Sequence, residues 1–373
     1  MYFIYFAVPA LFMIPVGIYL FYYLRRAAES SHMNIERRAA KAVLIILSVV
    51  LVIPAVNIWG FWAVVILHWF GFALCMEILN GIVRKVQERS KKNMWNLIYR
   101  SGLVPVLAAA VVLGYGYWNM GNIVETDYTV ETQKAIRSEG YRIAMISDLH
   151  FGTTMGKEKL KEYCLRIGET APDMVVLCGD IVDEKTTMGE MQEAFETLSS
   201  ISSPLGIFYV YGNHDQSHYS SDPYFTAAEL EETIRSNGIQ ILEDETVQVT
   251  EDMAIAGRKD RSSYLLDGRV DAGTLLGNTD KDDFLILADH QPVELEENRR
   301  AGYDLQISGH THGGQIWPVG LICDVLGFGE VNYGALKMDS MQVIVSSGIA
   351  GWGYPVRTGH HSEYVIVDIV PGE

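Results

Sequence analysis

The chain has 373 residues, enough for two domains with separate cores, and its charge is divided unevenly between them. Residues 1–118 carry 11 lysines and arginines against 4 acidic residues, whereas residues 119–373 carry 18 against 42. The acidic part argues against a nucleic-acid partner, because binding to phosphate backbones needs clustered Lys and Arg. The four cysteines form no C-x-x-C pair, which excludes a zinc ribbon and disfavours a disulfide framework.

The first part of the chain contains apolar runs long enough to cross a membrane. Residues 1–24 hold no charged side chain, and about 20 apolar residues suffice to span the hydrocarbon. Residues 42–80 carry a single charge, Glu77, and are long enough for two spans separated by a turn. A fourth run covers about residues 101–118. We therefore predict a transmembrane domain of four helices over residues 1–118; the alternative is a soluble bundle of buried helices.

Basic residues between the apolar runs predict the orientation of these helices, because cytoplasmic loops are enriched in Lys and Arg. With four spans and both basic loops inside, the domain after residue 118 lies outside the cytoplasm. Three spans would place it inside. We predict a multi-pass protein of the cell membrane with an extracytoplasmic globular domain. The basic residues of the two loops are Arg25, Arg26, Arg37, Arg38, Lys41, Arg84, Lys85, Arg89, Lys91, Lys92 and Arg100.

After a predicted polar linker at 119–140, short apolar runs alternate with helical segments over residues 141–373. Buried strands are predicted at 141–147, 174–178, 206–211, 239–242, 246–250, 253–257, 284–288, 304–308 and 342–346, and helices at 157–169, 189–200 and 226–236. Alternating strands and helices followed by strand-rich sequence predict an α/β layered sandwich, with two mixed β-sheets flanked by helices.

Polar clusters follow several predicted strands, where open α/β sheets place their ligand sites. In chain order the clusters are D-L-H at 148–150, G-D-I-V-D at 179–183, G-N-H-D at 212–215, D-H-Q-P at 289–292 and G-H-T-H-G-G at 309–314. An aspartate after a strand usually caps a helix or forms a turn, so each cluster alone is weak support. Five clusters in succession, on rigid strand ends, predict a site that holds two cations.

The ordered set D-x-H, G-D-x-x-D, G-N-H-D, H and G-H-x-H resembles the calcineurin-like metallophosphoesterase superfamily over about residues 140–370. The runs Gly309–Gln315 and Ser346–Arg357 resemble a bacterial branch that contains membrane-linked phosphodiesterases. The resemblance implies two metal sites that share a bridging carboxylate. Their ligands would be Asp148, His150 and His312 for the first metal, Asn213, His290 and His310 for the second, and Asp180 as the bridge.

Carboxylate and imidazole ligands suit manganese, zinc or iron, and the lack of thiolates argues against a purely structural zinc site. A hydroxide activated by two such cations would attack phosphorus in line. His214 is the candidate for protonating the leaving oxygen or stabilising the transition state, and Asp215 for orienting the His214 ring. By the same resemblance, Asp183 is expected to support a ligand rather than to bind metal. Arg357 is a candidate contact for the substrate phosphate.

These expectations combine into a membrane-anchored, dinuclear-metal phosphoesterase that acts on a phosphodiester or a lipid-linked phosphate. A second hypothesis keeps the metal site but places it in the cytoplasm, as a pyrophosphatase for a nucleotide-linked lipid of the UDP-diacylglucosamine type. A third is a catalytically silent membrane sensor or scaffold with a structural metal site. The adjacent His214 and Asp215 argue against the third hypothesis, because a structural site needs no proton donor.

Overall fold

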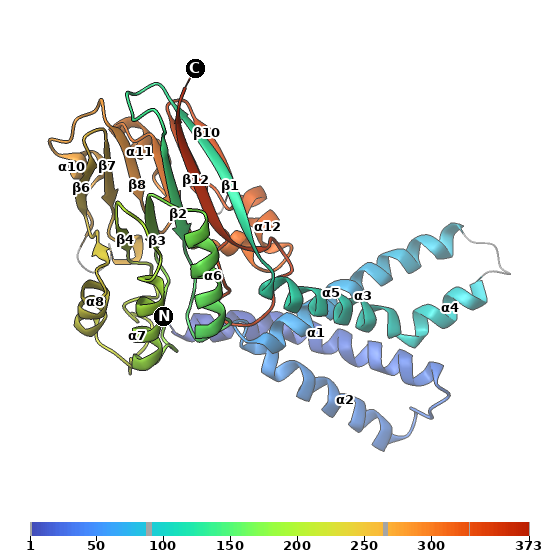
Figure 1. Ribbon diagram of the computed structural model, residues 1–373. Helices are drawn as coiled ribbons and strands as arrows, with labels where there is room; N and C mark the ends of the chain where they lie inside the picture. Colours follow the sequence, from blue (N-terminus) through green and yellow to red (C-terminus); the bar gives the residue numbers. More distant parts are fainter. Residues whose placement is uncertain (1, 87–91, 264–267, 328, 373) are drawn as a thin grey trace. The chain divides into compact units, whose positions relative to one another are not determined.

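The computed structural model describes residues 2–86, 92–263, 268–327 and 329–372. The chain divides into two compact units, Met1–Tyr115 and Gly116–Glu373. The first unit is helical, and the second contains two β-sheets with helices on their outer faces (Figure 1).

The first unit consists of long apolar helices. Its elements, including the helix that continues into the second unit, are α1 (Tyr2–Ser30), α2 (Arg38–Val52), η1 (Ile53–Val56), α3 (Phe61–Val86), α4 (Lys92–Ser101) and α5 (Leu103–Gly121). Among the described residues, four stretches are long and apolar enough to span a membrane: Val8–Ser30, Arg38–Val56, Phe61–Val86 and Leu103–Gly121. Their number equals the number of predicted spans. Helix α4 was not predicted, and Arg89 and Lys91 of the second basic loop lie outside the described residues.

Glu77, the single charge in the long apolar run, lies on α3 and is neutralised by partners from other helices. Its Oε1 atom lies 2.6 Å from Nη1 of Arg26 on α1 and accepts a hydrogen bond of 2.9 Å from Tyr19. The Tyr99 hydroxyl donates to the other carboxylate oxygen. These contacts offset the cost of placing an ionised carboxylate beside apolar helices.

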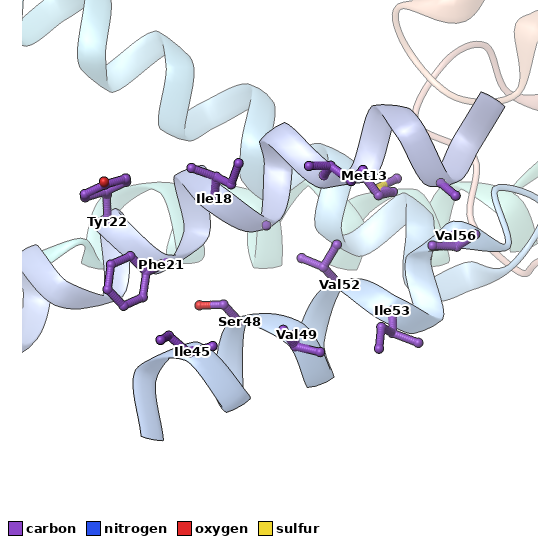
Figure 2. A pocket seen from close by; sticks show the side chains of 13 residues that line it. Met13, Ile18, Phe21, Tyr22, Ile45, Ser48, Val49, Val52, Ile53 and Val56 are labelled. Carbon is purple, nitrogen blue, oxygen red and sulfur yellow. The ribbon is translucent and has the colours of Figure 1, made fainter. Parts of the chain in front are cut away.

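An apolar groove of about 470 Å³ lies between α1 and α2 (Figure 2). Side chains such as Phe21 and Val52 line it with hydrocarbon, and Tyr22 and Ser48 add hydroxyl groups. The Ser48 hydroxyl donates to the Leu44 carbonyl at 2.8 Å and is therefore satisfied within its own helix. The groove is consequently compatible with lipid tails, which are as apolar as leucine.

The second unit is built on two six-stranded mixed sheets, with strand orders β1-β12-β2-β3-β4-β5 and β10-β11-β9-β8-β7-β6. The strands of the first sheet are β1 (Ile123–Thr132), β2 (Tyr141–Ile146), β3 (Met174–Cys178), β4 (Ile207–Val210), β5 (Gln240–Ile241) and β12 (Ser362–Pro371). Those of the second are β6 (Glu245–Thr250), β7 (Met253–Gly257), β8 (Phe284–Ala288), β9 (Leu305–Ser308), β10 (Gly334–Met338) and β11 (Met341–Val345). Strands β2 to β5 pair in parallel, as do β7, β8 and β9.

Helices cover both outer faces of this pair of sheets (Figure 1). They are α6 (Lys157–Glu169), α7 (Met188–Leu198) and α8 (Ala227–Ser236) on the first sheet and α10 (Ala272–Leu276) and α11 (Leu295–Ala301) on the second; η3 (Arg261–Ser263), η4 (His312–Gly314) and α12 (Val319–Leu326) lie in connections. Helix α7 begins at a capping box in which Thr187 and Glu190 satisfy each other's backbone N–H groups. Thr226 and Glu229 begin α8 in the same way.

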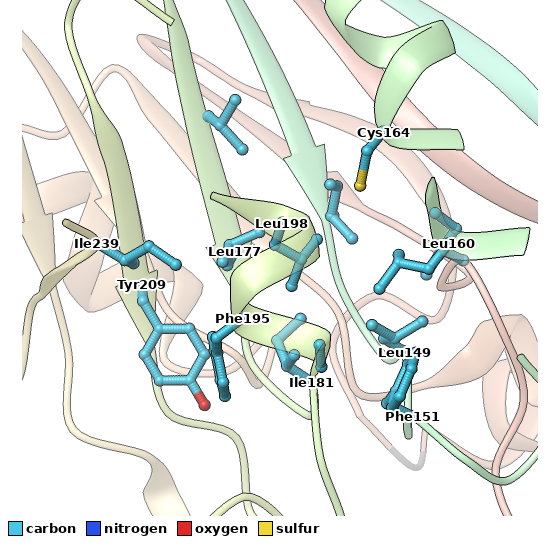
Figure 3. Close-up of a cluster of buried hydrophobic side chains, with 14 of the residues drawn as sticks. Leu149, Phe151, Leu160, Cys164, Leu177, Ile181, Phe195, Leu198, Tyr209 and Ile239 are labelled. Carbon is cyan, nitrogen blue, oxygen red and sulfur yellow. The ribbon is translucent and has the colours of Figure 1, made fainter. Parts of the chain in front are cut away.

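Three apolar clusters hold these layers together. Between the first sheet and its helices, Leu160 and Phe195 pack with sheet residues such as Tyr209 (Figure 3). Between the two sheets, fully buried side chains such as Met145 and Ile286 meet, and a third cluster lies under α10 and α11. The order helix, sheet, sheet, helix confirms the predicted α/β layered sandwich with two mixed sheets.

Residues 119–140, predicted as a polar linker, instead contain the end of α5 and the edge strand β1. Strand β1 pairs in parallel with β12 along its whole length. Its polar side chains alternate with apolar ones, so one face is exposed and the other is buried against the protein. The linker prediction was wrong because an edge strand with a polar face has the composition of a loop.

Candidate dinuclear metal site

The predicted metal ligands all lie just after the carboxyl ends of strands, and the two sheets bring these ends together. Asp148 and His150 follow β2, Asp180 follows β3, Asn213 follows β4, His290 follows β8, and His310 and His312 follow β9. Residues far apart in the chain, from both sheets, therefore converge on one edge of the sandwich.

The first group contains Asp148, His150 and His312, whose ligand atoms lie within 4.8 Å of one another. The Nε2 atoms of the two histidines are 3.3 Å apart, and Nε2 of His312 is 3.5 Å from Oδ1 of Asp148. Burial, with the neighbouring His150, holds the pKa of His312 well below its usual range, so its ring is neutral. The Nδ1 atom of His150 lies 3.5 Å from Oδ2 of Asp183, so this carboxylate lies beside a predicted ligand. Three electron-pair donors in such proximity fit a cation.

The second group contains Asp180, His290 and His310, with ligand atoms again within 4.8 Å. Nδ1 of His290 faces the Cys178 carbonyl at 2.8 Å and must donate, because a carbonyl oxygen only accepts. The Nε2 atom of His290 is buried and faces Oδ2 of Asp180. Burial disfavours the charged ring, but the Asp180 carboxylate raises the pKa of His290 well above its usual range, so a metal at Nε2 would take the place of a proton. Oδ1 of Asn213 lies 2.8 Å from Nδ1 of His310, so this fourth predicted ligand lies beside the group.

Asp180 lies between the two groups. Its Oδ2 atom is 3.1 Å from Nε2 of His290 and 3.8 Å from Nε2 of His150. Its Oδ1 atom accepts the backbone N–H of His214 at 2.9 Å. Burial opposes ionisation, but the neighbouring imidazoles, His290 foremost, hold the pKa of this carboxyl well below its usual range. Asp180 therefore lies close to ligand atoms of both groups.

The backbone around the site is strained in a way that a sequence pattern does not reveal. Asp148, His150, Asp180, His310 and His312 all have positive φ angles, between 42° and 70°. Few non-glycine residues adopt this left-handed region, and such strain concentrates at functional sites where surrounding structure enforces it. Five strained residues in one ligand set indicate that the fold aims these side chains at a common point.

Glycines beside the ligands allow the loops to approach each other closely. A Cβ atom on Gly212 would lie 2.2 Å from Oδ1 of Asp180, and one on Gly309 would lie 2.4 Å from Oδ2 of Asp148. Any side chain at these positions would displace a predicted ligand. The glycines of the G-N-H-D and G-H-T-H motifs are therefore steric requirements of the site.

His214, the predicted proton donor, lies beside the site and is held by Glu184. Its Nδ1 atom is 2.9 Å and 3.0 Å from the two Glu184 carboxylate oxygens. Burial disfavours the charged ring, but the Glu184 hydrogen bond and the Asp180 charge outweigh it and raise the pKa of His214 to about 8. Sequence reasoning missed Glu184, although it directly follows the G-D-x-x-D motif.

Asp215 does not orient the His214 ring, which corrects the prediction for this residue. Its carboxylate accepts backbone N–H groups of Asp180, Ile181, Val182 and Gly212 at 2.6–3.1 Å. Burial and the nearby Asp180 charge raise the pKa of Asp215 to about 6. The residue therefore fastens the loop after β3 to the loop after β4, and through that loop it positions Asp180.

The position of Arg357 also contradicts its predicted role as a contact for the substrate phosphate. The side chain is fully buried, and burial lowers its pKa to about 10. Nη1 donates to the His312 carbonyl at 2.9 Å, and Nη2 donates to the Ala350 carbonyl. The guanidinium thus ties the last metal-ligand loop to the segment after β11 and presents no group at the surface.

Aromatic side chains form walls beside His214. The ring centroid of Tyr219 is 5.2 Å from that of His214, and the centroid of Trp352 is 5.5 Å away. Trp352 belongs to the run Ser346–Arg357 that was singled out in the sequence, whereas Tyr219 carried no recognisable signal. These rings give the side of the site next to the predicted proton donor an apolar surface.

Comparison with known proteins agrees with this geometry. The family model of calcineurin-like phosphoesterases matches residues 141–314. A metallophosphoesterase of Aquifex aeolicus is 31% identical over 70% of this chain and 97% of its own length, and one of Bacillus subtilis is 31% identical over 60% and 79%. A zebrafish (Danio rerio) transmembrane protein with a metallophosphoesterase domain is 26% identical over 82% of this chain and 70% of its own.

The chain therefore belongs to the calcineurin-like metallophosphoesterases, which are dimetal-dependent hydrolases of phosphoesters. The four long apolar helices and the similarity to a transmembrane relative support a location in a membrane.

Proposed function

We propose that this protein is a membrane-anchored phosphoesterase that cleaves a phosphodiester or a lipid-linked phosphate. The observation that carries the proposal is the pair of ligand groups, Asp148–His150–His312 and Asp180–His290–His310, with Asp180 between them. Imidazoles and carboxylates in this arrangement fit manganese, zinc or iron. Two such ions would supply Lewis acidity and an activated water.

The residues of the chain provide the remaining chemistry. His214, whose raised pKa favours the protonated ring, is placed to donate a proton to a leaving oxygen. Glu184 positions that ring, and Asp215 holds the loop that carries Asp180. A purely structural metal site would need neither a proton donor nor a carboxylate to position it, which favours an enzyme over a silent scaffold.

The preference for diesters and lipid-linked phosphates rests on the membrane helices and on the apolar walls. Tethering retains the enzyme beside substrates of the same bilayer, and the rings of Tyr219 and Trp352 suit a substrate with an organic group on the leaving side. With the catalytic domain outside the cytoplasm, the substrates would be lipid head groups, wall polymers or other extracellular phosphodiesters. With the domain inside, a pyrophosphate-linked lipid would replace them.

The test uses the full-length chain in detergent or lipid nanodiscs. The protein is stripped of metal, reloaded with manganese, zinc, iron or magnesium, and assayed on aryl phosphodiesters and phosphomonoesters, with bound metal measured in parallel. We expect metal-dependent turnover with diesters preferred. Because loss of residues that merely support ligands costs about 10–100-fold, Asp180→Asn should lower turnover by at least about 100-fold. Equal turnover by this variant would overturn the proposal.

A further inference from the structure

An exposed apolar helix lies next to the metal site in the second unit. Helix α12, with the preceding Trp317, presents a cluster of large apolar side chains to the surface, and Trp317 and Val325 are 65% and 74% exposed. The cluster consists of Trp317, Val319, Leu321, Ile322, Val325 and Leu326. Contiguous apolar patches of this kind mark interaction surfaces rather than ordinary protein exterior.

The segment that carries α12 is fastened to the metal-ligand loop at both ends. At its start, Gly314 packs so closely that a Cβ atom there would lie 2.3 Å from the backbone nitrogen of Gly320. At its end, the carbonyl of Asn332 accepts a hydrogen bond of 2.6 Å from the Thr311 hydroxyl. Thr311 lies between the predicted ligands His310 and His312, so α12 is held beside the site.

The same segment is tied to the point at which the fourth apolar span ends. The backbone N–H of Trp317 donates to Thr358 at 3.0 Å. The neighbouring N–H of Arg357 donates to the carbonyl of Gly116 at 3.0 Å, and the Asn119 side chain donates to the carbonyls of Arg357 and His360 at 3.1 and 3.0 Å. Gly116 and Asn119 belong to the last turns of α5, which closes the span Leu103–Gly121. One short loop therefore contacts both the exit of the span and the start of α12.

The end of that span has the composition of a membrane boundary. Tyr117 and Trp118 lie there with 68% and 59% of their surfaces exposed, and such aromatic residues are enriched where a helix leaves the hydrocarbon. Figure 1 shows α12 beside the end of the second unit at which β1 begins, directly after α5. The start of α12 is thus held, through the loop at 357–360, close to the end of the fourth apolar span.

We propose that α12 and Trp317 insert their apolar side chains into the surface of the same bilayer that holds the membrane helices. The occupant of the patch is hydrocarbon rather than anionic head groups, because residues 316–327 contain one charged residue, Asp324, and no lysine or arginine. This contact would hold the metal site beside the lipid surface. This membrane contact does not depend on whether the substrate is a lipid.

The experiment measures the depth of a probe on α12 in the full-length chain. Val325→Cys is labelled with an environment-sensitive fluorophore after Cys75→Ser and Cys323→Ser, and the protein is placed in nanodiscs of phosphatidylcholine with or without nitroxide-bearing lipid. The control label is at Lys281→Cys, an exposed position before the amino end of β8, the end opposite the metal site. We expect the emission of the label at residue 325 to be blue-shifted relative to the control label. We also expect the nitroxide lipid to quench it roughly threefold or more above the control. Added salt should change neither result.

A second variant pair tests whether the apolar side chains cause the contact. With the label at Leu321→Cys, Val325→Asp should reduce lipid quenching severalfold. Leu165→Asp, a matched change at an exposed apolar side chain on α6, should leave it unchanged. Quenching no greater than at Lys281→Cys would overturn the proposal. The proposal would also be overturned by a blue shift that occurs without lipid quenching and increases with protein concentration. The patch would then bind a second copy of the chain.

Discussion

The Nδ1 atom of His214 lies 2.9 Å from a carboxylate oxygen of Glu184, and this pair stands at the edge of the predicted metal site. Glu184 therefore orients the His214 ring. The sequence had predicted this role for Asp215, which directly follows His214 in the chain. Residues around the site thus have two different roles. Glu184 orients a side chain proposed to react, whereas Asp215 holds two loops together.

Glu184→Gln should lower kcat about 10–100-fold, because the His214 ring loses the carboxylate that orients and charges it. His214→Asn should lower kcat about 10²–10⁴-fold, the usual contribution of a general acid. Both losses should grow as the leaving group of an aryl phosphodiester becomes more basic. Steady-state kinetics across a leaving-group series would measure this, with bound metal unchanged. Glu193→Gln, at a partly exposed glutamate on α7, is the matched control. Losses that ignore the leaving group would contradict proton donation.

Asp215→Ala should destabilise the catalytic domain, because it leaves four buried backbone N–H groups without their acceptor. We expect a loss of about 3–5 kcal/mol, or a fall in Tm of roughly 6–20 °C. Thermal unfolding of the full chain in detergent would report it. Asp222→Ala, at an exposed aspartate, should have little effect. An unchanged Tm with lost turnover would return Asp215 to a direct catalytic role.

Arg357→Lys should lower stability, bound metal and kcat, and leave KM nearly unchanged. A lysine has one nitrogen and cannot reach the carbonyls of both His312 and Ala350 as the guanidinium does. The expected destabilisation is about 1.5–3 kcal/mol for the lost charged hydrogen bond. Arg166→Lys, at an exposed arginine on α6, serves as the control. A rise in KM with normal stability and metal content would instead support the original prediction of a phosphate contact.

The orientation of the membrane helices predicts where a reporter is active. A β-lactamase fused after Asn122, at the end of α5, should confer resistance only if the catalytic domain lies outside the cytoplasm. Fusions after Glu36, in the first basic loop, should be inactive, and fusions after Ile58, between α2 and α3, should be active. An inactive fusion after Asn122 would mean that three spans cross the membrane and that the metal site is cytoplasmic.

Much of the fold was predictable because its signals are local. The buried strands β3 and β8 are continuous apolar runs, β2 is apolar except for Arg142, and α6 has apolar residues at helical spacing. Each is therefore recognisable within a short window. Strand β1 was missed because its polar alternation has the composition of a loop. Helix α12 was missed because eight residues are too few for helical periodicity to stand out.

The sequence by itself determined the order and chemistry of the polar clusters and the length of the apolar helices. These depend on residue type and spacing along the chain, which folding does not change. Only the tertiary structure decided which carboxylate holds His214, why Arg357 is buried, and that an apolar helix lies beside the metal-ligand loop. Each of these depends on contacts between residues distant in the chain and on the exclusion of water, and neither is encoded in the local pattern of the sequence.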